Sequence, residues 1–314
     1  MLGVFLTVLP VFLLLAGGYG AVRAGYLPAG IADALNAYAV KLAVPALLFK
    51  AIAGLDFGEA FHPGMLAAFY AGALASFAAG LFGAHRLFGR RPGEAVAVGF
   101  SAMFSNTVLL GLPILERAFG HDALPPGYAI VALHAPLLYI VGIVAMEAMR
   151  RDGSTPGDAA RAAAKAILGN ALMFGILAGA AVNLSGMPLP EPVAAAVSML
   201  AASAIPAALV GIGASLTRYR ISDELPETLM VSALTLLLHP AIAFALAYWV
   251  FALPPAYVRA AVVIAAMPPG MNIYVFALMY DRAVSLSASA ILVATALSVI
   301  TVTAWLALLN AVLG

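Results

Sequence analysis

Hydrophobic segments follow one another along nearly the whole chain, separated by short charged or Pro/Gly-marked breaks. A membrane-spanning helix needs roughly 20 consecutive apolar residues, because the hydrocarbon layer is about 30 Å thick. Of the 314 residues, 64% are hydrophobic and 9% are charged, whereas soluble domains carry about 25% charged residues. The chain is therefore predicted to be an integral membrane protein.

The breaks divide the chain into ten predicted membrane spans. They lie near residues 2–22, 31–54, 63–85, 94–117, 126–149, 160–184, 191–216, 226–251, 256–280 and 286–312. The first run lacks the basic start and the cleavage pattern of a signal peptide, so we expect it to remain as a span. The chain has no cysteine and a net charge of +1. These values exclude disulfides and thiolate metal sites and argue against a nucleic-acid partner.

Loop charges predict the orientation, because cytoplasmic loops are enriched in Lys and Arg. Eleven basic residues fall in one set of alternate loops and three in the other. This bias predicts a multi-pass protein of the cytoplasmic (inner) membrane with both termini outside. It also places the longest polar segment, a hinge loop over residues 150–160, in the cytoplasm.

An internal repeat relates the two halves of the chain. KLAVPALLF (41–49) in the second span resembles ASAIPAALV (202–210) in the seventh, and their prolines are 161 residues apart. The same offset carries Asn106 to the start of the proline-rich stretch MPPGMN (267–272). With five spans in each half, the second half inserts upside down relative to the first. The sequence therefore predicts a 5+5 inverted repeat.

Two predicted spans contain proline where a membrane helix tolerates it least. FSNTVLLGLPI (104–114) carries Pro113, and MPPGMN carries Pro268, Pro269 and Gly270. Non-helical backbone survives at this depth only when it is buried in protein or lines a wet cavity. Paired interruptions in inverted halves indicate a transporter's binding site. Ordinary proline kinks, satisfied by neighbouring helices, are the alternative.

The two interruptions also carry hydrogen-bond donors suited to an anion. Because the two spans run in opposite directions, their breaks are expected to cross near the midplane. Each second half-helix then presents its amino end, whose free N–H groups favour negative charge. Asn106 and Asn272 add side-chain amides, and Ser105, Thr107 and Tyr274 add hydroxyls.

These motifs resemble the auxin efflux carrier family, which includes the plant PIN auxin exporters and bacterial malate and malonate permeases. The likeness rests on FSNTVLLGLPI, on AAMPPGMNIYVFA (265–277) and on Pro45 within VPALLF, and it covers essentially the whole chain. It implies an all-α fold of ten transmembrane helices with broken, crossing helices 4 and 9, as in bile-acid transporters and sodium/proton antiporters. Carried over residue by residue, the family's crossover positions are Asn106, Pro113, Pro268 and Asn272.

The resemblance also implies that the spans form two domains with different roles. Spans 1, 2, 6 and 7 form a scaffold, often dimeric, and spans 3–5 and 8–10 form a transport unit that moves against it. We therefore expect a homodimer with a scaffold domain over residues 1–54 and 160–217 and a transport domain over residues 63–150 and 225–313.

Ionisable residues at bilayer depth are functional candidates. Lys41 either attracts an anion or snorkels to the cytoplasmic side. His239 either carries a coupling proton or is a neutral histidine bonded to a neighbouring helix, and His134 is a similar but weaker candidate. No Asp or Glu lies within either break, which argues against cation exchange. Coupling to protons, coupling to sodium held by carbonyls and uniport all remain open.

The sequence therefore favours a secondary transporter of a small organic anion, a mono- or dicarboxylate, working by elevator-type alternating access. Pro45 and Lys41 complete the predicted binding set, and no metal or cofactor is expected. A non-transporting membrane receptor or an intramembrane enzyme is the alternative. The sequence contains no HExxH helix, no serine motif with a suitable base and no GxxxxGK[ST] loop, which argues against an enzyme and an ATP-driven pump.

Overall fold

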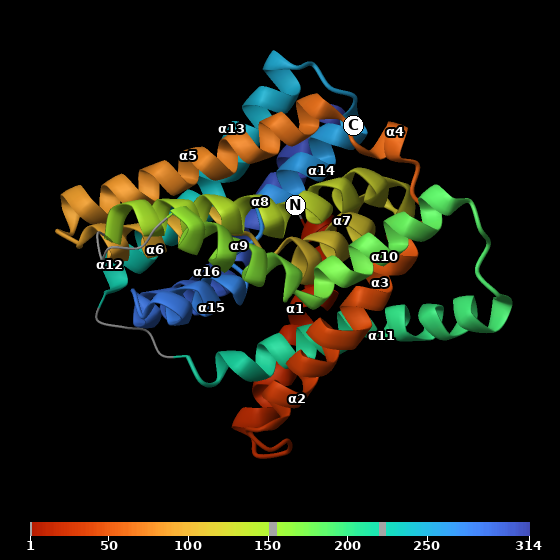
Figure 1. The fold of residues 1–314 in the computed structure, drawn as a ribbon, viewed down its shortest axis with the longest axis horizontal. Helices are drawn as coiled ribbons and strands as arrows, with labels where there is room; N and C mark the ends of the chain where they lie inside the picture. Colours follow the sequence, from red (N-terminus) through yellow and green to blue (C-terminus); the bar gives the residue numbers. More distant parts are fainter. Residues whose placement is uncertain (1, 151–155, 220–223) are drawn as a thin grey trace. The chain divides into compact units, whose positions relative to one another are not determined.

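The computed structural model describes residues 2–150, 156–219 and 224–314, and these residues form helices joined by short connections (Figure 1). The long helices are α1 (Leu2–Arg23), α5 (Pro63–Leu87), α8 (Leu124–Arg150), α11 (Glu191–Leu216) and α16 (Val284–Leu313). The shorter α-helices are α2 (Ile31–Tyr38), α3 (Val44–Ala53), α4 (Phe57–Ala60), α6 (Pro92–Met103), α7 (Leu112–Phe119), α9 (Pro156–Leu168), α10 (Ala171–Ser185), α12 (Leu225–Ala233), α13 (His239–Phe244), α14 (Pro255–Ala265) and α15 (Asn272–Tyr280). The remaining turns are η1 (Ala39–Ala43), η2 (Thr107–Gly111), η3 (His121–Ala123), η4 (Leu234–Leu238) and η5 (Ala245–Val250).

Long apolar helices make this a multi-pass membrane protein. Among the described residues, seven helical segments are long and apolar enough to cross a membrane. The bent pair α9 and α10, which turns by 72°, makes an eighth if it is counted as one span. The predicted spans 4 and 9 are each divided into two short helices, α6 with α7 and α14 with α15. The all-helical membrane class is therefore confirmed, and the count of ten spans stays a prediction.

The chain divides into two compact units. The first unit contains Met1–Val8, Phe61–Ala163 and Tyr219–Gly314, and the second contains Leu9–Ala60 and Ala164–Arg218. Both interrupted spans lie in the first unit, where α5 packs along α6 and α13 packs against both α5 and α14 (Figure 1). The second unit is built mainly from α2, α3, α10, α11 and most of α1.

Glycines bring helices of the second unit into close contact. A Cβ atom added to Gly179 of α10 would lie 2.6 Å from the carbonyl oxygen of Phe49 on α3. A Cβ atom added to Gly18 of α1 would overlap the carbonyl oxygen of Val210 on α11. Because a side chain at either position would collide with backbone, each helix pair approaches closely only through glycine.

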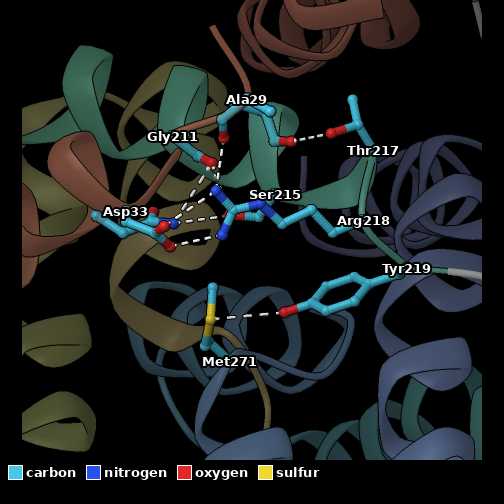
Figure 2. A network of polar contacts seen from close by, with 10 residues as sticks. Ala29, Asp33, Gly211, Ser215, Thr217, Arg218, Tyr219 and Met271 are labelled. Atoms are coloured by element: carbon cyan, nitrogen blue, oxygen red, sulfur yellow. Dashed lines mark hydrogen bonds and ion pairs between the residues drawn. The ribbon is translucent and has the colours of Figure 1, made fainter. Parts of the chain in front are cut away.

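Polar contacts tie the carboxyl end of α11 to α2 and to the residues that precede it (Figure 2). The guanidinium of Arg218 donates to both carboxylate oxygens of Asp33, at 2.6 and 3.0 Å, and to the carbonyl oxygen of Ala29. The side-chain amide of Asn36 donates to the hydroxyl of Ser215 at 2.7 Å. These contacts fix the end of α11 at the point where the chain leaves the second unit.

In the first unit, the loop between α5 and α6 is clamped to the start of α12. Nε of Arg90 donates to both carboxylate oxygens of Glu227 at 3.0 Å, and Nη2 of Arg90 contacts Glu224. The side chain of Glu227 is buried. Hydrogen bonding to Glu227, more than to Glu224, raises the pKa of the Arg90 guanidinium above its ordinary value.

Three prolines in the apolar helices follow a wide helical turn. Pro45, Pro113 and Pro240 stand two residues after the ends of η1, η2 and η4, respectively. Proline lacks an N–H donor, and its ring collides with the carbonyl four residues earlier in a regular α-helix. The wider π-type turn relieves this collision. Pro113 is therefore carried within a continuous helix, and the interruption of the fourth predicted span falls earlier, at residues 104–106.

Candidate functional site

Two non-helical segments of the first unit lie against each other. Residues 104–106 separate α6 from η2, and residues 266–271 separate α14 from α15. Ser105 and Pro269 form an isolated antiparallel bridge between them. We call these two segments the crossover. Its backbone hydrogen bonds run from Asn106 N–H to Pro268 C=O at 2.8 Å and from Gly270 N–H to Phe104 C=O at 3.3 Å. The two breaks thus satisfy each other's backbone groups, as buried non-helical backbone requires.

The predicted asparagines lie at the crossover and keep part of their surface accessible. Asn106 packs against Gly270, where an added Cβ atom would lie 3.4–3.5 Å from Asn106 atoms. Asn272 begins α15, and its Oδ1 accepts a hydrogen bond from the hydroxyl of Tyr139 at 3.3 Å. Thr107 begins η2 and is buried. The structure therefore places both predicted side-chain amides on the two paired breaks.

Both helices that leave the crossover have their amino ends there, where local carbonyls accept from some of the first N–H groups, such as those of Thr107 and Ile273. The first N–H groups of a helix have no partner within it, and they carry a partial positive charge. α15 begins at Asn272, and η2 begins at Thr107 and continues directly into α7. Two helix amino ends and two side-chain amides thus meet at one place, an arrangement suited to a bound anion.

Two buried histidines contact the crossover at Ser105. Nε2 of His134 on α8 lies 3.1 Å from the carbonyl oxygen of Ser105. Nε2 of His239 lies 3.1 Å from the carbonyl oxygen of Phe69, and its Nδ1 lies 3.4 Å from Oγ of Ser105. Since a carbonyl only accepts, each Nε2 carries a hydrogen. A neutral imidazole satisfies both contacts of His239. A role of His239 in proton coupling stays a prediction.

An aromatic cluster packs next to the crossover. The rings of Phe100 on α6 and Phe276 on α15 are stacked, with centroids 3.9 Å apart and planes 10° apart. Tyr139 on α8 lies 5.5 Å from the Phe100 ring and 5.6 Å from the Phe104 ring, measured between centroids. Gly142, one turn further along α8, leaves room for the ring of Phe100. The cluster joins a half of each broken span to α8.

Tyr274 lies on α15 and is partly exposed. Its ring centroid is 5.7 Å from that of Tyr219, whose hydroxyl donates to the sulfur of Met271 at 3.6 Å (Figure 2). Tyr274 therefore belongs to an aromatic pair next to the crossover. Pro113 stands further along, inside α7.

The last two predicted residues belong to the second unit. Lys41 lies on η1 and is exposed, and Pro45 lies near the start of α3 and is buried. The carbonyl of Pro45 is in close contact with Gly175 of α10. The contacts described here for the crossover all lie within the first unit. A binding role of Lys41 and Pro45 therefore stays a prediction.

Sequence reasoning passed over Tyr139. The phenol hydroxyl of a buried tyrosine usually finds a hydrogen-bond partner, and this requirement is its only signal in the sequence. The partner, Asn272, is 133 residues away. Similarly, the sequence gives His134 little weight, whereas the structure places it on the crossover carbonyl.

An apolar helical chain with two interrupted, paired helices is typical of a membrane transporter. The family model described as "Membrane transport protein" matches residues 3–306. The chain therefore belongs to this family, the auxin efflux carrier family that its motifs resemble. It is a membrane transporter and not an enzyme.

Two relatives match along almost their full lengths. A protein of Rhizobium meliloti (strain 1021) named "Putative malonate transporter" is 28% identical over 301 residues, which cover 93% of each chain. A protein of Methanothermobacter thermautotrophicus named "Uncharacterized transporter" is 25% identical over 304 residues, covering 95% of this chain and 96% of the relative.

Proposed function

We propose that this protein is a carrier for a small organic anion, a mono- or dicarboxylate, which binds at the crossover. One observation carries the proposal: the side-chain amides of Asn106 and Asn272 lie where two helices begin, at breaks that are hydrogen-bonded to each other. A carboxylate accepts hydrogen bonds from such donors, and the helix amino ends add favourable charge. Malonate is the first substrate to test, because one relative carries that name.

Helix positions support a transporter of ten spans in two inverted halves. α2 and α11 begin 160 residues apart, and α6 and α14 begin 163 residues apart. The close glycine contacts follow the same spacing, because Gly18 and Gly179 are 161 residues apart, and so are their partners Phe49 and Val210. Equivalent helices thus make equivalent contacts in the two halves, as an inverted repeat requires.

The two compact units suggest how the carrier moves. In our proposal the second unit is the scaffold, through which two copies form a homodimer, and the first unit carries the crossover across the membrane. Elevator-type movement then alternates access to the bound carboxylate. The loop charges support a place in the inner membrane with both termini outside.

Counterflow of radiolabelled malonate in proteoliposomes tests the proposal. We expect exchange by the wild type, and strongly reduced exchange at the same malonate concentration for Asn106→Ala and Asn272→Ala. Asn310→Ala is the matched control, since Asn310 is an exposed residue near the end of α16. A protein that binds malonate but never exchanges it would be a receptor, and that result would overturn the proposal.

A further inference from the structure

Tyr139 makes one hydrogen bond to the side chain of Asn272, the first residue of α15. Its hydroxyl donates to Oδ1 of Asn272 at 3.3 Å, and its side chain is 6% exposed. The rings of Phe100, Phe104 and Phe276 surround the tyrosine ring, with centroids 5.5, 5.6 and 6.4 Å away. This packing leaves the phenol little freedom to move away from Asn272.

The hydrogen bond from Tyr139 determines which polar group of the Asn272 amide, the oxygen or the NH₂ group, is left for a ligand. A primary amide has a carbonyl that accepts and an NH₂ group that donates. When the carbonyl oxygen is turned toward the phenol, the NH₂ group points the other way, so Asn272 would present a donor to a ligand and not the oxygen. A carboxylate, which only accepts, fits this arrangement in full.

From this geometry we infer that Tyr139 is a positioning residue, which fixes the amide of Asn272 and makes the site select carboxylates over the matching carboxamides. The inference rests on the proposed function. Without the phenol, the Asn272 amide can turn by 180° and accept from a carboxamide NH₂ group. With the phenol in place, that turn would remove an acceptor from the buried hydroxyl, and a carboxamide NH₂ group would face another donor.

The test compares Tyr139→Phe with Tyr70→Phe. Both changes remove one tyrosine hydroxyl in the first unit and keep the ring. The hydroxyl of Tyr70 donates to the backbone carbonyl of Ile130 at 2.8 Å, away from Asn272. Kd values for malonate and for malonamide, its diamide, are measured by calorimetry in detergent, and the melting temperature of each ligand-free protein is recorded.

Tyr139→Phe removes the hydrogen bond that orients Asn272, the proposed donor to the charged malonate, so we expect malonate binding to weaken about 10-fold. We also expect the malonate and malonamide Kd values to come closer together. Tyr70→Phe should leave their ratio at the wild-type value even if its melting temperature falls. A general loss of structure would weaken the binding of both ligands alike. The ratio of the two Kd values therefore separates a positioning role from an effect on stability.

Two results would overturn the inference, and they are distinguishable. If Asn272→Ala weakens malonate binding but Tyr139→Phe keeps the wild-type ratio, the inference fails and the proposed function stands. If neither malonate nor any acid of a carboxylate panel binds, or if Asn272→Ala binds malonate as the wild type does, the proposed site fails and the inference fails with it. Should Tyr139→Phe not fold, Tyr139→Leu, which is smaller and also lacks the hydroxyl, should likewise bring the malonate and malonamide Kd values closer together; a wild-type ratio in that folded variant contradicts the inference.

Discussion

Ser105 is the residue at which the buried polar contacts of the crossover meet. Its carbonyl oxygen is contacted by His134, and its hydroxyl lies between Nδ1 of His239 at 3.4 Å and the carbonyl oxygen of Ala265 at 3.5 Å. Each of these residues is buried. A change at either histidine is therefore expected to disturb the crossover through Ser105.

His239 provides the first prediction. In His239→Leu the carbonyl of Phe69 loses its side-chain donor, and the Ser105 hydroxyl keeps only Ala265. Because the Phe69 carbonyl keeps its partner within α5 and Ser105 keeps Ala265, the variant loses only hydrogen bonds, each worth about 0.5–1.5 kcal/mol net. We expect the free energy of unfolding to fall by about 1–2 kcal/mol. His239→Gln keeps a donor near the Nε2 position and should recover part of the loss. Unfolding in detergent measures both variants, and equal losses would contradict the prediction.

His239→Gln also tests whether His239 carries a coupling proton. If His239 is a neutral contact, folded His239→Gln transports with the wild-type dependence on pH. If His239 carries the coupling proton, that dependence flattens in His239→Gln. Initial rates of counterflow and of net uptake, measured in proteoliposomes between pH 5 and 8, distinguish the two interpretations that the sequence leaves open.

At the scale of helices, Gly142 is a spacer between α8 and the aromatic cluster. An added Cβ atom would overlap the Phe100 ring and lie 3.1 Å from the Phe276 ring. Since overpacking costs about 1–3 kcal/mol, we expect Gly142→Ala to destabilise the protein by that amount and to weaken malonate binding. Gly17→Ala is the control, because nothing lies within 4 Å of its added Cβ atom. Equal melting temperatures for the two variants would contradict the prediction.

The ion pairs of Arg90 provide a second prediction for helices. Breaking a buried ion pair costs about 3–5 kcal/mol, but the Arg90 side chain is 20% exposed. We therefore expect Arg90→Ala to lower the free energy of unfolding by about 2–3 kcal/mol. Asp33→Asn, which weakens the exposed pair with Arg218, should lower it much less, because water screens an exposed pair. Chemical unfolding in detergent compares them, and similar losses would argue against the clamp.

Local sequence predicts the interruptions well, because proline and glycine act on the chain segment in which they lie. The stretches 104–114 and 267–272 do contain or adjoin the two breaks. The position of the first break within its stretch could not be predicted from Pro113. A π-type turn absorbs that proline, and whether such a turn forms depends on packing against other helices.

The contacts of the site were harder to predict than the elements that carry it. Asn106 and Asn272 are visible in the sequence as polar residues at breaks. The contacts from Tyr139 to Asn272 and from His134 to Ser105 join residues that are far apart in the chain. They depend on how α8 packs against both broken helices, and no local pattern encodes that packing.

For the whole molecule, the absence of cysteine allows the ten-span topology to be tested with single introduced cysteines. Tyr26, Leu87, Asp122 and Met187 are exposed residues in four connections or at their edges. We predict that a membrane-impermeant maleimide labels Asp122→Cys and Met187→Cys in intact cells but labels Tyr26→Cys and Leu87→Cys only after permeabilisation. Labelling of Leu87→Cys and Asp122→Cys from the same side would mean that α6 and α7 do not cross the membrane together.

The most direct test of carboxylate binding at the crossover is thermal stabilisation of purified protein by a panel of small carboxylates. A ligand at 100 times its Kd stabilises by about 2.7 kcal/mol. Loss of one amide–carboxylate hydrogen bond costs about 1.5–3 kcal/mol, so Asn106→Ala should need roughly 10- to 150-fold more of the stabilising acid. Asn310→Ala should behave as the wild type does. If the same concentration of acid stabilises the wild type and Asn106→Ala equally, the anion does not bind at the crossover.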